Sequence, residues 1–118
     1  CGKLKSILIS NSLTSIGGSA FGGCTALHSF AFPDSVTSIG GKAFYECESL
    51  TSIIIPESVT YIGVRAFDRC FSLRSVTIPD SNITIDQRAF SVCPRLKTVS
   101  IPEGLEYPSD AFPSGSTI

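Results

Sequence analysis

Apolar and polar positions recur along this chain at a fixed interval of 23 residues. The dipeptide Ala-Phe shows the interval most clearly, and leucine, cysteine and proline keep it at their own places. The copies are Ala20-Phe21, Ala43-Phe44, Ala66-Phe67, Ala89-Phe90 and, one residue early, Ala111-Phe112. A period of this length is typical of a short unit that stacks on copies of itself, because one unit cannot bury its apolar face alone. The chain is therefore predicted to be a repeat solenoid.

The third repeat shows which elements each unit contains. Ile53 and Ile55 alternate across Ile54, which fits a short strand with a period of two. This strand is expected to end at Pro56, because proline lacks the amide that would continue a ladder. A second extended piece is predicted around residues 59–62. The Ala-Phe-x-x-Cys segment that follows has the spacing of one turn of α or 3₁₀ helix.

Stacked copies of this unit predict parallel strands about 4.8 Å apart. Connections between parallel strands of a sheet are nearly always right-handed, so the same hand is expected here. The predicted fold is a right-handed coil of about five 23-residue rungs, made mainly of short parallel β-strands with single helical turns. By its length the chain is expected to be one domain over residues 1–118. Its repeated apolar residues then become continuous columns of Leu, Ile or Val, Phe and Cys.

The unit reads roughly L-x-x-I-x-I-P-x-x-V-T-x-I-G-x-x-A-F-x-x-C-x-x, and the match is close over residues 27–49 and 50–72. This pattern resembles the BspA-like leucine-rich repeat family, and about ten positions coincide at one period. The fourth repeat departs from it, with Asn82 and Asp86 where Val and Gly belong. The fifth repeat is one residue short. These changes weaken the prediction of the second extended piece in the last two repeats.

Composition narrows the classes of partner. A formal net charge of −1 provides no basic field to attract nucleic acid, so no such partner is expected. No apolar run approaches the roughly 18 residues that span a membrane, so membrane insertion is not expected. Gly115 and Ile118 fall at the Cys and Leu positions of a further rung. We expect a fragment of a longer array, with a self-capped short protein and end-to-end stacking of copies as open alternatives.

Five cysteines hold the same place in successive repeats: Cys1, Cys24, Cys47, Cys70 and Cys93. Side chains that point the same way from adjacent rungs rarely reach the torsion of a disulfide. The prediction is a row of buried free thiols with weak hydrogen bonds, which react only after denaturation. A zinc site would need short pairs such as C-x-x-C, and the sequence has none. No metal or cofactor is expected.

Candidate catalytic residues are few. His28 lies four residues after Cys24, and the two could act as base and nucleophile. Against this, Cys24 is one of five equivalent cysteines expected inside the coil. The equivalents of His28 are Lys5, Thr51, Arg74 and Lys97, which form a solvated rim. The protein is therefore not expected to be an enzyme.

Two further features have weak functional meaning. An acidic residue follows the proline of four repeats: Asp34, Glu57, Asp80 and Glu103. Such a column could bind calcium, but a solvated edge is favoured because acids are mostly exposed. Asn82-Ile83-Thr84 is a formal glycosylation acceptor, which matters only in a secreted eukaryotic protein.

The strand face is the surface best suited to function. Alternation directs Ser52 and Ile54 outward, and the equivalent positions form two outward columns. These are Ser6, Ser29, Ser52, Ser75 and Thr98, beside Leu8, Ala31, Ile54, Thr77 and Ser100. The first column fits a structural ladder of hydroxyl groups better than a binding role. The second varies from rung to rung, as a recognition face would, and its first three members make a small apolar patch.

We therefore interpret the chain as a non-enzymatic recognition or adhesion module that binds partners through this strand face. The family resemblance implies a secreted or cell-surface protein of bacteria or protists. It also implies partners among extracellular-matrix, host-cell or microbial surface proteins. The competing hypothesis is a structural one, in which the array is a spacer or a self-associating filament unit that stacks end to end.

Overall fold

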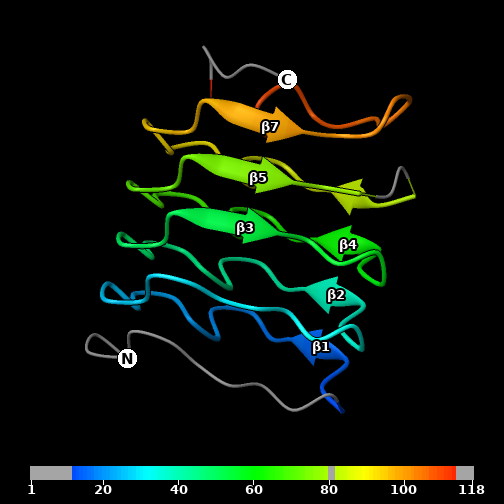
Figure 1. Ribbon diagram of the computed structural model, residues 1–118, viewed down its shortest axis with the longest axis horizontal. Coiled ribbons are helices and arrows are strands. Elements are labelled where there is room, and N and C mark those ends of the chain that lie inside the picture. Colours follow the sequence, from blue (N-terminus) through cyan, green and yellow to red (C-terminus); the bar gives the residue numbers. More distant parts are fainter. Residues whose placement is uncertain (1–11, 80–81, 114–118) are drawn as a thin grey trace.

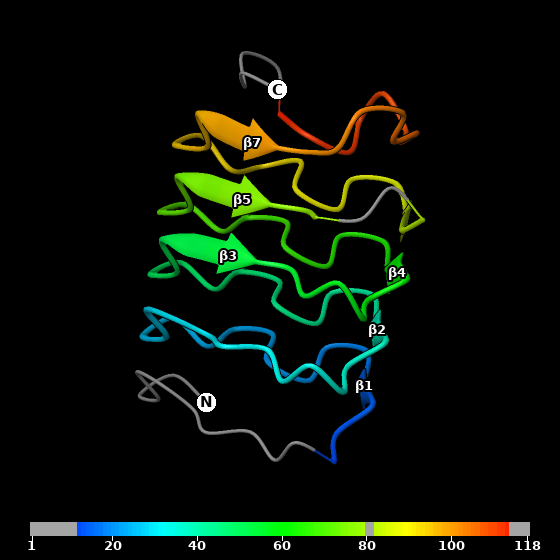
Figure 2. The same ribbon diagram turned by 45° about the vertical axis from the view of Figure 1, so that its right-hand side comes forward.

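A computed structural model describes residues 12–79 and 82–113, which form a coil of stacked rungs (Figure 1). The strands of these residues are β1 (Ser15–Ile16), β2 (Ser38–Ile39), β3 (Ser52–Ile54), β4 (Tyr61–Ile62), β5 (Ser75–Thr77), β6 (Thr84–Ile85) and β7 (Thr98–Ser100). They make two parallel sheets with the orders β1-β2-β4-β6 and β3-β5-β7. Figures 1 and 2 show the two sheets on different sides of the coil. The predicted solenoid is confirmed.

The register of the sheets follows the sequence period. Ser52 lies opposite Ser75, and Ser75 lies opposite Thr98, so each partner is 23 residues further along the chain. The other sheet keeps the same interval between Ser38 and Tyr61. Equivalent residues of successive rungs therefore lie directly beside one another, as the periodicity predicts.

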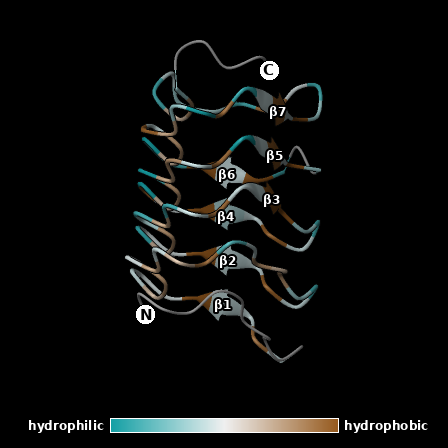
Figure 3. Ribbon diagram, turned by 60° about the vertical axis from the view of Figure 1, so that its left-hand side comes forward, coloured by the Kyte–Doolittle hydropathy of each residue, from teal (hydrophilic) through white to brown (hydrophobic). Residues whose placement is uncertain are grey.

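The core consists of columns of like side chains. Phe44, Phe67 and Phe90 are fully buried and stack face to face, with centroids 5.0 and 4.9 Å apart and planes within 2°. The leucines of the repeats form a second buried column, and the inward residues of β3, β5 and β7 form a third. Their members include Leu27, Leu50, Leu73 and Leu96, and Ile53, Val76 and Val99. The hydropathy colours of Figure 3 agree, with the most hydrophilic segments in the loops at the edges of the coil.

The predicted helical turn is wrong, since the described residues contain no helix. The Ala-Phe segments instead form a turn ribbon, which comprises residues 17–24, 40–47, 63–70 and 86–93. In the second of these, the amide of Tyr45 donates to the Lys42 carbonyl of its own rung at 3.1 Å. The adjacent amide, that of Phe44, donates to the Ala66 carbonyl of the following rung at 2.7 Å. A helix would keep both hydrogen bonds within one rung, whereas alternate amides here tie neighbouring rungs together.

Residues with positive φ make this ribbon possible. Lys42 and Glu46 have φ of 57° and 59°, and Arg65 and Arg69 repeat these values one rung later at 57° and 62°. The rungs also approach closely at the start of the ribbon. A Cβ on Gly63 would lie 2.5 Å from the backbone nitrogen of Gly41, so no side chain fits there.

The two irregular repeats behave differently. In the fourth repeat the second extended piece is present as β6, and Ile83 supplies the buried apolar residue with 5% exposure. In the fifth repeat no strand pairs with β6 within the described residues, although Leu105 remains buried. The fourth repeat therefore keeps its second strand despite the departures at Asn82 and Asp86. The fifth repeat is one residue shorter, and within the described residues it lacks the equivalent strand.

Candidate functional site

The interior cysteines follow the prediction. Cys47, Cys70 and Cys93 are buried free thiols. Each donates to the carbonyl of a phenylalanine one rung earlier, at 3.2 Å for Cys47 to Phe21 and 3.3 Å for Cys70 to Phe44. Burial raises the pKa of Cys47 to about 11. Contact with the Cys93 thiol, together with burial, raises the pKa of Cys70 well above its ordinary value.

Cys24 does not follow the prediction, because it is disulfide-bonded. Its sulfur partner is not among the described residues, and Cys1 also lies outside them. The interior thiols each use a carbonyl located 26 residues upstream, as Cys93 does with Phe67 at 3.2 Å.

No catalytic pair forms at His28. The imidazole is exposed on the surface, whereas Cys24 is fully buried and has no free thiol to act as a nucleophile. The acidic column is exposed at Asp34, Glu57 and Glu103, and Asp80 lies outside the described residues. Within the described part of the chain, no cluster of three or more His, Cys, Asp or Glu residues is arranged to hold a metal ion. The same residues contain no helix long and apolar enough to cross a membrane.

Two carboxylates accept hydrogen bonds from neighbouring rungs, and these bonds give each carboxylate a structural role. Asp68 is buried, and its Oδ1 accepts hydrogen bonds from the Ser91 hydroxyl at 2.9 Å and the Val92 amide at 3.0 Å. Asp86 accepts a hydrogen bond from the Tyr61 hydroxyl at 3.0 Å, which raises the pKa of Tyr61. The repeat pattern did not single out Asp68, because its equivalents are not carboxylates.

The strand face has the orientation that alternation predicts. In β3 the side chains of Ser52 and Ile54 are exposed while Ile53 is buried. β7 repeats this pattern, and β5 keeps the same alternation with Ser75 only partly exposed. The described members of the two predicted columns all lie on this side: Ser29, Ala31, Ser52, Ile54, Ser75, Thr77, Thr98 and Ser100. Ser6 and Leu8 lie outside the described residues. Ile54 is the most exposed large apolar residue of the described chain, at 70%.

A hollow of about 260 Å³ lies beside Ile54, and its remaining lining is Ser29, Phe30, Ala31, Phe32 and Ser52. Phe30 packs edge-on against Phe32 and Phe44, with ring centroids 4.7 and 4.9 Å apart. Four predicted binding residues therefore share one concave surface with two aromatic residues that the prediction missed. Phe30 and Phe32 occupy the inward positions that Ile53 and Ile55 hold one rung later. This enlargement from Ile to Phe is the sequence feature that could have revealed them.

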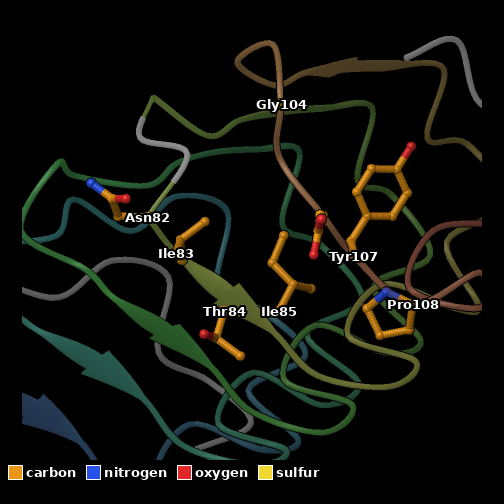
Figure 4. A pocket seen from close by; sticks show the side chains of 8 residues that line it. Asn82, Ile83, Thr84, Ile85, Gly104, Tyr107 and Pro108 are labelled. Atoms are coloured by element: carbon orange, nitrogen blue, oxygen red, sulfur yellow. The ribbon is translucent and has the colours of Figure 1, made fainter.

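Two larger hollows lie elsewhere. One of about 550 Å³ separates residues 82–85 from residues 104–108, where the fifth repeat fails to pair with β6 (Figure 4). The other, of about 530 Å³, lies at the start of β5 and β7 and includes Arg74, Arg95 and Lys97. Arg74 and Lys97 belong to the predicted solvated rim, to which the sequence assigned no function.

Parallel rungs, a leucine column and an exposed strand face define a leucine-rich repeat solenoid. The chain belongs to the BspA type leucine rich repeat family, which matches residues 1–118 in 6 copies. The prediction of about five rungs differs slightly from this number of copies and from the four-stranded and three-stranded sheets of the described residues. This scaffold is compatible with a protein-interaction module.

Solved structures of bacterial leucine-rich repeat proteins share the fold. A leucine-rich repeat protein of Bacteroides ovatus is 36% identical over 98% of this chain, with a TM-score of 0.85. TpLRR of T. pallidum is 32% identical over 91%, also with a TM-score of 0.85. The pneumococcal vaccine antigen PcpA is 27% identical over 96%, with a TM-score of 0.82. The chain spans 30%, 50% and 29% of these proteins, respectively. Comparison with curated protein sequences found no significant match.

Proposed function

We propose that the chain is a non-enzymatic recognition or adhesion module whose strand face binds a protein partner. The strand face comprises the outward residues of β3, β5 and β7 together with residues 29–32. The observation that carries this proposal is Ile54, which is 70% exposed beside the aromatic hollow. Burying such a side chain against a partner contributes about 1.5–3 kcal/mol.

The composition of the strand face suits protein recognition. An apolar side chain of a partner fits the hollow between Ile54 and Phe32, where it contacts apolar atoms on both sides. The hydroxyls of Ser29 and Ser52 lie at its edge and supply hydrogen-bonding groups. An apolar centre within a polar rim is the usual organisation of a protein interface. The second column, from Ala31 to Ser100, changes in polarity from rung to rung, whereas the inward residues of the same strands stay apolar.

We place the module on a secreted or cell-surface protein, with partners among extracellular-matrix, host-cell or microbial surface proteins. The family membership and the likeness to a pneumococcal vaccine antigen support this proposal. The chain covers only part of each related structure, so the proposal concerns this module and not a whole protein.

Binding to a panel of purified extracellular-matrix proteins, measured by surface plasmon resonance, tests the proposal. We expect a positive partner to lose at least tenfold in affinity with Ile54→Asp. Val64→Asp is the matched control, because Val64 is also an exposed apolar residue, at 40%, but lies on the turn ribbon. Equal affinity of the wild type and Ile54→Asp would show that the strand face is not the binding surface.

The structural alternative is favoured by one observation. Within the described residues, β6 and β7 are end strands of their sheets, and an unpaired strand edge can pair with another chain. Light scattering across a range of protein concentrations separates the two functions. A filament unit would grow in mass as the concentration rises, whereas a recognition module would keep one mass.

A further inference from the structure

The hollow at the start of β5 and β7 is lined by three positively charged side chains. Its volume is about 530 Å³, and its lining is Arg74, Ser75, Pro94, Arg95, Lys97 and Thr98. We call it the basic groove. Its three cationic side chains are exposed, and it contains no carboxylate.

None of the three cations forms an ion pair with an acidic residue within residues 12–79 and 82–113. The ion pair found among the described residues joins Arg88 to Asp110 at 3.7 Å, away from the basic groove. Arg74 and Lys97 lie on adjacent rungs, and the Lys97 amide donates to the Arg74 carbonyl at 3.1 Å. Like charges on adjacent rungs repel each other, and an anion placed between them removes the repulsion. The groove is therefore complementary to a negatively charged ligand.

Toward the N-terminus, the positive charge does not continue into the two rungs that precede the basic groove. The positions equivalent to Arg74 and Lys97 carry His28 and Thr51 in the preceding rungs. The position of Arg95 carries serine in the two rungs before it. At about 4.8 Å per rung the charged surface is short, which suits a few carboxylates. A sulfated polysaccharide would favour cations that continue along the coil, so an acidic peptide segment is the better fit.

The basic groove also joins the strand face. Ser75 is the first residue of β5 and Thr98 the first of β7, and both line the groove while belonging to the outward column. A single extended partner can therefore contact the strand face and the groove together. Pro94 adds an apolar wall, which a peptide backbone or side chain can pack against.

We propose that the basic groove binds an acidic segment of the protein partner, rich in Asp or Glu. This inference rests on the proposed recognition function and names the chemistry of its partner. Guanidinium groups hold carboxylates in bidentate geometry, and the lysine adds a third charge. The groove thus selects among partners by charge, while the hollow beside Ile54 selects by shape.

Fluorescence anisotropy with a fluorescein-labelled hexaglutamate peptide tests the inference. The test variant is Arg74→Thr/Arg95→Ser, which uses residues found at the equivalent positions Thr51 and Ser72. The control is Arg69→Glu, which uses the residue of the equivalent Glu46 and lies on the turn ribbon. Each variant changes the net charge by −2. Circular dichroism and thermal melting check that all three proteins fold.

We expect saturable binding by the wild type that weakens as salt is added, because exposed charges are screened. The double variant should lose at least tenfold in affinity, and Arg69→Glu should stay within twofold. Absence of peptide binding, or equal losses in both variants, would overturn the inference. So would tight binding of a heparin oligosaccharide without binding of the peptide. A matrix protein could bind Ile54→Asp more weakly than wild type and yet bind the double variant as tightly as wild type. That result would support the recognition function and refute the acidic segment.

Discussion

Phe67→Ala perturbs the phenylalanine column at its centre. The ring of Phe67 is fully buried and lies between those of Phe44 and Phe90, with centroid distances of 5.0 and 4.9 Å. The substitution therefore removes two stacked aromatic contacts and leaves a cavity between two rungs. The rungs on either side are fixed by hydrogen bonds of the turn ribbon, such as the Phe67 amide to Ala89 at 2.7 Å, so they cannot close it.

The expected cost follows from these contacts. Each stacked aromatic pair contributes about 0.5–1.5 kcal/mol beyond the burial of apolar area. A phenylalanine truncated to alanine in a rigid core typically costs about 3–5 kcal/mol in total. Phe21→Ala is the internal comparison, because Phe21 is only partly buried and stacks on a single equivalent ring, that of Phe44, at 5.3 Å. We expect it to cost clearly less.

Equilibrium unfolding in urea, followed by circular dichroism, measures both variants. Native domains are stable by about 5–15 kcal/mol, so Phe67→Ala can unfold the protein outright. Phe67→Leu then gives a measurable intermediate, since it keeps part of the apolar volume. A free energy of unfolding for Phe67→Ala within about 1 kcal/mol of wild type, below the range for a filled core site, would refute the stacked column.

Three further changes test other contacts. Gly63→Ala should destabilise by about 1–3 kcal/mol, because the added methyl meets the preceding rung, whereas Gly17→Ala meets nothing within 4 Å. Equal melting temperatures for these two variants would contradict the close approach of Gly63 to the backbone of Gly41. Asp68→Ala should cost about 1–3 kcal/mol by removing the acceptor of the Val92 amide, and an unchanged urea midpoint would refute that role. The raised pKa of Cys47 means that the neutral thiol stabilises the fold fully below pH 9.0 and less as the pH approaches 11. Between pH 8 and pH 10.5, the free energy of unfolding in urea should decrease less for Cys47→Ala than for wild type. Equal decreases would count against the buried thiol.

The sequence predicts the fold well because each core position is repeated. A column such as Phe44, Phe67 and Phe90 needs only equal spacing along the chain, and register then follows from stacking. The helical turn was wrong for a physical reason. Apolar spacing in the Ala-Phe segment is compatible with a helix, but spacing does not show that alternate amides donate to the next rung.

The candidate site was less accessible to sequence reasoning. Outward positions such as Ser52 and Ile54 follow from alternation and were found. The hollow beside them depends on how Phe30 and Phe32 pack, which a change of side-chain volume within a repeat only indicates. The basic groove was missed because Arg95 is not in the column of Arg74 and Lys97, and only the turn between rungs brings them together.

Nuclear Overhauser spectroscopy on labelled protein tests the central claim, that rungs lie in register along one interior. If the rungs lie in register, backbone protons of residues 23 positions apart are in contact, from Ser52 to Ser75 and from Ser75 to Thr98. Contacts between the rings of Phe67 and Phe90 are also expected. Strand contacts at a different interval, or phenylalanine rings without mutual contacts, would show that the rungs are not stacked in register.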